Sequence, residues 1–146
     1  MDKVYIGYII NIIIFVAGYI GGSVREGRKR KRDRLADLKR ELEININNLS
    51  ESAVRYYTTN LDERERNCES ALISHKSKTI NYKLKQLEDA AEKQKGYFYQ
   101  TFTCFHEALT AEPFGDVNFN PIVHNHRRIR QIESAESDLL GEIESV

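Results

Sequence analysis

Four side chains of the types that bind metal ions stand in two closely spaced pairs. Cys104 and His106 are separated by one residue, as are His124 and His126. Thiolate and imidazole groups are ligands that zinc prefers in proteins. Residues two apart on a helix diverge by about 200°, so each pair would have to straddle a helix end. Structural zinc sites also use other spacings, so these four residues are weak candidates and we predict no metal site.

Other motifs that carry chemistry are missing from the sequence. The chain has no phosphate-binding glycine loop, no HExxH, no paired CxxC and no GxSxG. We therefore expect no cofactor, and the sequence favours a role without catalysis. An alternative is a small enzyme or effector whose site contains His106, His124, His126 and nearby carboxylates. The basic HNHRRIR run at 124–130 could bind an anion at the start of a helix.

The N-terminal segment is the most distinctive feature of the sequence. Residues 4–22 carry no charge, and a strongly basic run follows them directly. A helix of this length measures roughly 28 Å, close to the hydrocarbon thickness of a bilayer. Basic residues after a span stay in the cytoplasm. The pattern predicts a single-pass signal anchor in the inner membrane, with the N-terminus outside and the C-terminal part cytoplasmic.

The basic run is expected to contact anionic lipid headgroups. Its residues are Arg25, Arg28, Lys29, Arg30, Lys31, Arg32 and Arg34. The expected organisation is therefore a transmembrane anchor at 1–24, a basic juxtamembrane segment at 25–34 and a helical cytoplasmic domain at 35–146. No nucleic-acid partner is expected, because the run lacks interleaved aromatic residues and a second basic face.

Small and polar residues share one face of the expected membrane helix. Gly7, Asn11, Gly18 and Gly22 are spaced by four, seven and four residues, and the last two form a GxxxG pair. Glycines let two helices approach closely, and an asparagine can hydrogen-bond across such an interface. We expect these four residues to form a helix–helix interface in a homo-oligomer.

The rest of the chain is predicted to be all-helical. Apolar residues recur at steps of three and four from Leu35 to Tyr56, and four leucines with Asn45 also fit coiled-coil positions. The fold class is thus all-α, with one N-terminal transmembrane helix followed by a helical-bundle or coiled-coil-like domain. Asn60 is the expected N-cap of the next helix. The pattern leaves open whether residues 61–95 form one helix or two.

The second half of the chain carries further helical stripes. One is expected at Leu61, Cys68, Leu72, Ile80, Leu84, Leu87 and Ala91, with a polar stretch at 74–79 between its parts. An aromatic stripe of Phe98, Phe102, Phe105 and Leu109 is expected in the core. Residues 110–119 are predicted to be a loop, and Asn120 and Pro121 to begin the last helix. That helix would bury Ile122, Ile129, Ile132, Leu139 and Ile143.

These patterns favour a membrane-tethered scaffold, adaptor or regulatory subunit that self-associates and holds an unidentified protein at the cytoplasmic membrane face. If the topology were reversed, the architecture of a span and a helical body resembles inner-membrane spanins, which are phage lysis proteins. That resemblance rests on architecture and on no shared motif. It implies a periplasmic body, whereas the basic run at 25–34 indicates a cytoplasmic one.

Overall fold

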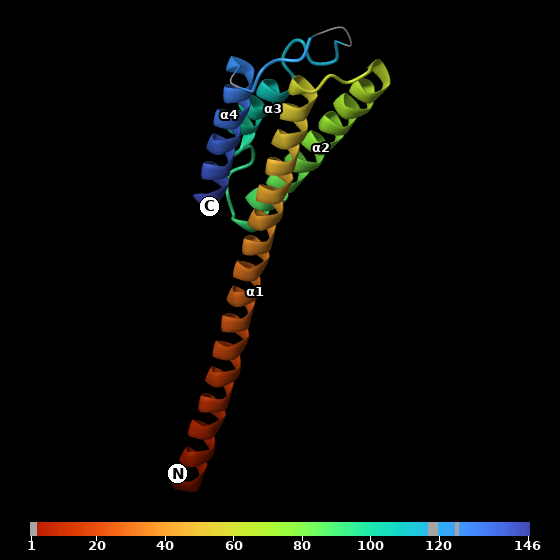
Figure 1. Cartoon of the computed structure of the whole chain (residues 1–146). Helices are drawn as coiled ribbons and strands as arrows, with labels where there is room; N and C mark the ends of the chain where they lie inside the picture. The colour runs from red at the N-terminus through yellow and green to blue at the C-terminus, as the bar shows by residue number, and fades with distance from the viewer. Residues whose placement is uncertain (1–2, 117–119, 125) are drawn as a thin grey trace. The chain divides into compact units, whose positions relative to one another are not determined.

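Helices form all of the regular structure in the residues that the computed structural model describes, which are 3–116, 120–124 and 126–146, with side chains from residue 25 onward. They are α1 (Lys3–Thr58), α2 (Glu63–Ala90), α3 (Tyr99–Thr110) and α4 (Arg127–Glu144) (Figure 1). The predicted all-α secondary structure is confirmed over these ranges. The chain divides into two units, Met1–Ala36 and Asp37–Val146, while the predicted boundaries after residues 24 and 34 stay predictions.

The predicted membrane anchor is contradicted. From residue 25 onward, no described helix combines the length and apolarity that crossing a bilayer requires. Charged residues crowd α1 at positions 25–43, so this described part of the helix is too polar to lie in hydrocarbon. The predicted inner-membrane localisation and topology depended on this anchor, so they are contradicted as well. Residues 4–22, and the predicted interface of Gly7, Asn11, Gly18 and Gly22, lie outside the described side chains.

The basic segment belongs to the first unit. All of its arginines and lysines from Arg25 to Arg34 are exposed, and Arg30 forms an ion pair with Glu26 at 2.5 Å one helical turn away. Exposed pairs of this kind contribute at most about 1 kcal/mol. Contact of this segment with anionic lipid stays a prediction.

The part of α1 in the second unit supplies one wall of the core. Leu42, Ile46, Leu49, Ala53 and Tyr56 are fully buried, which confirms this section of the predicted stripe. Truncating a buried leucine or isoleucine of this kind to alanine typically costs about 2–5 kcal/mol. Asn45, expected at a coiled-coil position, is half-buried and donates a hydrogen bond to the Glu41 carbonyl of its own helix at 2.7 Å.

Helix α2 begins two residues later than predicted. Its N-cap is Asp62, whose side chain accepts from the Glu65 N–H at 2.8 Å, while the Glu65 carboxylate accepts from the Asp62 N–H at 3.1 Å. This reciprocal capping box satisfies two helix-end donors, so Asn60 is not the cap. The helix continues without interruption through the polar residues 74–79, and residues 63–90 therefore form one helix.

The buried face of α2 matches the predicted stripe at Ile80, Leu84 and Leu87 but is rotated relative to it in the first half of the helix. Cys68 is exposed and Leu72 is 42% exposed, whereas Ile73 is fully buried. Arg66, Ser77 and Glu88 are buried polar residues of the same helix. Arg66, for example, is 2% exposed, lies with its guanidinium 5.5 Å from the centroid of the Tyr56 ring, and donates a 3.4 Å hydrogen bond to the Leu61 carbonyl.

A buried carboxylate shapes the connection between α2 and α3. Glu88 is 6% exposed and accepts hydrogen bonds from the Gly96 and Phe98 N–H groups, both at 3.1 Å. Gly96 has φ +79°, a conformation that favours glycine. In the predicted aromatic stripe, Phe98, Phe105 and Leu109 are buried and Phe102 is half-buried. The connection thus places the aromatic face of α3 against the core.

The last helix begins later than predicted. Its N-cap is His126, whose side chain accepts from the Arg128 N–H at 3.2 Å, so the assignment of Asn120 and Pro121 to a helix start is wrong. Ile122 precedes the helix, is half-buried, and donates its N–H to the Tyr57 carbonyl at 2.9 Å. The other predicted core residues of α4 are buried: Ile129, Ile132, Leu139 and Ile143.

The helices of the second unit run alternately up and down (Figure 1). Polar contacts join each to its neighbours: α1 to α2 through Glu41 and Lys83, and α3 to α4 through Thr101 and Glu142. Helix α1 also meets the end of α4, where Lys39 Nζ donates to the Glu144 carbonyl at 3.1 Å. This is a helical bundle, with its core between the apolar faces described above.

Candidate functional site

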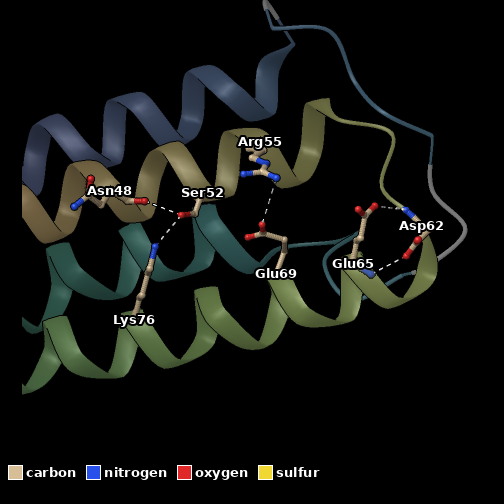
Figure 2. A network of polar contacts seen from close by, with 7 residues as sticks. All are labelled: Asn48, Ser52, Arg55, Asp62, Glu65, Glu69 and Lys76. Carbon is tan, nitrogen blue, oxygen red and sulfur yellow. Dashed lines mark hydrogen bonds and ion pairs between the residues drawn. The ribbon is translucent and has the colours of Figure 1, made fainter.

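Helices α1 and α2 diverge toward the loop that joins them, and a groove of about 570 Å³ opens between them. The capping box at Asp62 marks the start of α2 at the end of this loop (Figure 2). The groove side chains that matter below are Asn48, Ser52 and Arg55 from α1, and Leu72, His75 and Lys76 from α2.

A lysine reaches across this groove. Lys76 Nζ donates to Ser52 Oγ at 3.0 Å, and Ser52 Oγ in turn donates to the Asn48 carbonyl one turn earlier at 2.8 Å (Figure 2). Lys76 is half-buried, and none of the described carboxylates lies within ion-pair distance of its ammonium group. An ammonium group has three N–H donors, so Lys76 retains donor capacity inside the groove.

An arginine borders the same groove closer to its open end. One Arg55 nitrogen lies 3.9 Å from a Glu69 carboxylate oxygen, which is an ion pair but too long for a hydrogen bond (Figure 2). The Arg55 side chain is 66% exposed, so solvent screens this pair strongly. The guanidinium can therefore exchange this loose pair for a carboxylate that binds it directly.

Leu72 and His75 give the groove a mixed character. Leu72 is one of the exposed large apolar side chains of the second unit, and His75 is also exposed. The groove is thus lined by two cationic groups, the Glu51 carboxylate, side-chain amides and an exposed leucine. Its surface offers both charged and apolar contacts.

Comparison with known proteins gives no further guide, because no protein family, curated protein or solved structure matches this chain. The assignment of a role to this chain therefore rests on the geometry of its own residues.

The predicted metal candidates occupy different environments. Cys104 is exposed on α3, and His106 Nδ1 pairs with Ser77 Oγ at 2.8 Å. His124 borders a hollow between α1 and α4, while His126 caps α4. Within the described ranges, no three His, Cys, Asp or Glu side chains are placed to hold a metal ion.

The basic run at 124–130 is in part structural. Arg128 donates to the Glu112 carbonyl at 2.6 Å, and its guanidinium lies 5.8 Å from the centroid of the Tyr57 ring. These contacts attach the first turn of α4 to the Glu112 carbonyl and to the end of α1. Anion binding by this run stays a prediction.

The groove residues were not among the sites predicted from the sequence. Lys76 and Arg55 stand at polar positions of helical stripes, where a charged side chain usually faces solvent. The signal available was the polar break at 74–79 in the stripe of α2. Its meaning depends on which helix lies opposite, which the pattern of one helix does not reveal.

Proposed function

We propose that this chain is a helical binding module, an adaptor or scaffold, whose α1–α2 groove receives an acidic helical segment of a partner protein. The observation that carries the proposal is Lys76, a half-buried ammonium group that faces the groove with donor capacity left over. A carboxylate is the group that complements such a donor best, because hydrogen bonds between charged groups are the strong ones.

The neighbouring side chains support the same class of partner. Arg55 offers a second cation whose present pairing to Glu69 is loose, and its planar donors match a carboxylate. Leu72 offers an apolar contact of the kind that an amphipathic helix uses when it lies in a groove. The partner segment is accordingly a helix with glutamates on one face and at least one leucine beside them.

Self-association belongs to the same proposal. Helix α4 is an acidic helix in which no basic residue follows Arg130. Its exposed carboxylates include Glu133, Asp138 and Glu144. A second copy is therefore one source of an acidic segment, alongside a different protein.

A direct test measures binding of a fluorescently labelled helical peptide that carries Glu at i and i+4 beside one Leu. The full-length protein should bind it with an affinity that falls as salt rises, because salt screens the charges. The matched peptide with Gln in place of Glu should bind at least about fivefold more weakly. Equal binding of the two peptides would show that the groove does not distinguish a charged side chain from a neutral one.

Variants locate the contact on the protein. Lys76→Gln should weaken binding of the Glu peptide, whereas Lys78→Gln, at an exposed position of the same helix, should not. Sedimentation of wild type and Lys76→Gln then separates the sources of the segment: a concentration-dependent dimer that the substitution weakens identifies a second copy. A peptide affinity that Lys76→Gln leaves unchanged would contradict the proposal.

A further inference from the structure

The exposed ridge of α1 separates two surfaces of opposite charge. On one side is the α1–α2 groove, whose cationic groups are Arg55 and Lys76. On the other side is a hollow of about 710 Å³ between α1 and α4, which Glu133 and Glu136 border from α4. Glu51 and Arg55 stand on the ridge and border both spaces. The groove, the ridge and the hollow therefore form one continuous surface, which we call the α2–α1–α4 face.

The acidic side of this face has the composition that the groove is proposed to receive. Glu133, Glu136 and Leu140 are spaced by three and four residues, so they share one side of α4. Glu133 is exposed, whereas Glu136 and Leu140 are half-buried. None of the described lysines and arginines forms an ion pair with either glutamate. Helix α4 thus carries two carboxylates beside one leucine, and both carboxylates are open to a cationic surface.

The charged groups on the two sides of the ridge stand at the same level along α1. Lys76 Nζ donates to Ser52 Oγ at 3.0 Å, and the Glu136 carboxyl lies beside the Ser50 hydroxyl. Two residues of a helix correspond to about 3 Å of rise. Lys76 and Glu136 are therefore nearly level with each other on opposite sides of the ridge. A symmetric pairing of this face with a second copy of itself requires such a match.

A two-fold axis that runs along the ridge makes use of the match. It turns the face onto a second copy, keeps each group at its level and exchanges the two sides, so α4 of each copy lies over the groove of the other. Lys76 then meets Glu136 of the second copy. Helix α4 runs antiparallel to α1 (Figure 1), so Glu133 stands nearer to the Arg55 end of the ridge and meets Arg55. An axis across the helices would instead place α4 against α4, where like charges repel.

We propose that the α2–α1–α4 face is the interface of a symmetric dimer, in which α4 of each copy is the acidic helix that the groove of the other copy binds. The inference rests on the proposed function and names its partner. A two-fold interface is self-complementary, so each charged pair forms twice. Ile44 lies on the same ridge, seven residues before Glu51, and is 51% exposed, so it supplies an apolar contact near the axis.

Charge reversal in the full-length protein tests the pairing. Lys76→Glu and Glu136→Lys should each weaken dimer formation at least about tenfold in sedimentation equilibrium, because each variant brings like charges together in both pairs. An equal mixture of the two variants should restore the dimer, since both pairs of a mixed dimer again have opposite signs. Lys78→Glu, at an exposed position outside the groove, is the matched control and should dimerise as wild type does. A mixture that associates no better than the separate variants would overturn the inference.

A second pair of variants guards against loss of the fold. Circular dichroism melting checks each protein, because Glu136 is half-buried and its replacement by lysine can unfold the helix pair. Arg55→Glu and Glu133→Lys repeat the test at two exposed positions. Each should dimerise more weakly than wild type, and their mixture should recover the dimer. A mixture of these folded variants that does not recover it would equally contradict the pairing.

The Glu-containing peptide separates this inference from the proposed function. The peptide occupies the groove, so it should dissociate the wild-type dimer in proportion to its own binding. Peptide binding that depends on Lys76, in a protein that sediments as a monomer at every concentration, would overturn the dimer and leave the proposed function standing. Absence of peptide binding, together with a dimer that survives all four charge reversals, would contradict both.

Discussion

The Tyr57 hydroxyl donates a hydrogen bond to the Leu109 carbonyl at 2.8 Å, which joins the last turn of α1 to the last turn of α3. The same hydroxyl lies 3.1 Å from the Ala111 carbonyl, just beyond that helix. Tyr57 is fully buried, so its hydroxyl has exchanged solvent for the carbonyl groups at a helix end, which lack partners within the helix.

Replacing Tyr57 with phenylalanine should therefore destabilise the bundle. Tyr57→Phe removes the hydroxyl donor and leaves buried carbonyl groups without a hydrogen bond. Such a loss typically lowers the free energy of unfolding by about 1–3 kcal/mol. Urea unfolding followed by circular dichroism measures the change. Tyr82→Phe is the matched control, because Tyr82 is 64% exposed and its substitution should change the free energy of unfolding very little.

The same tyrosine predicts how stability depends on alkaline pH. Burial raises the pKa of Tyr57 from 10.0 to about 12, and the positive charge of Arg128 opposes this only in part. The neutral phenol is thus favoured in the folded state. Its contribution is fully present below the unfolded-state pKa and is lost as the pH rises through the folded-state pKa.

Urea unfolding of wild type and Tyr57→Phe across the alkaline range checks this. The difference in unfolding free energy between the two should be constant up to about pH 9 and should shrink from about pH 10 upward, where the unfolded tyrosine ionises. A difference that stays constant up to about pH 12 would show that Tyr57 ionises equally in both states.

The start of α2 allows a test of cap assignment. Asp62→Ala should lower the free energy of unfolding by about 1 kcal/mol, because it removes the side chain that accepts from the Glu65 N–H. Asn60→Ala, two residues earlier, should be nearly neutral, since Asn60 lies outside the capping box. Thermal melts of the two variants distinguish the assignments, and a larger loss in Asn60→Ala would contradict the cap at Asp62.

Replacing each of two glycines with alanine should change the free energy of unfolding in opposite directions. Gly96 has φ +79°, and an added Cβ would meet its nearest neighbour, Tyr99 Cβ, at an ordinary 3.8 Å, so the cost is in the backbone. Gly96→Ala should destabilise by about 1 kcal/mol. Gly141 lies inside α4 with open space around it. Gly141→Ala should stabilise by about 0.5–1 kcal/mol, and matching signs in chemical denaturation would refute the argument.

The sequence predicts the fold best where most of the residues that face the core are apolar. In α1 the spacing of Leu42, Ile46, Leu49 and Ala53 identifies the buried face, and in α4 Ile129, Ile132, Leu139 and Ile143 do the same. Periodicity is informative there because burial and apolarity coincide.

Prediction succeeds only in part in α2. Ile80, Leu84 and Leu87 are buried as predicted, but Leu72 is not, and Arg66, Ser77 and Glu88 are buried although they are polar. Hydrophobic periodicity assigns polar residues to the surface, and the stabilising contacts of these three come from other parts of the chain. His106 provides one example, since its ring pairs with Ser77 from the neighbouring helix at 2.8 Å. The cap at Asp62 could, however, be predicted from the sequence, because Asp followed three residues later by Glu is a capping-box signature.

The candidate sites were harder to predict than the fold. Lys76 and Ser52 are 24 positions apart, and their contact requires the antiparallel packing of two helices. The hollow between α1 and α4 likewise depends on which face of α4 lies against α1. Such sites form only where two helices pack together, so the apolar pattern along one helix cannot predict them.

Glu51 and Arg55 border both the α1–α2 groove and the hollow between α1 and α4, so one ridge of α1 is a wall common to both. An acidic helix that engages Arg55 from the groove changes the charge that this ridge presents to the hollow. Linkage then requires that any charged group in the hollow alters the affinity of the acidic helix by the same factor by which the helix alters its own. A helix that does not change shape can in this way couple two surfaces of the bundle through charge alone.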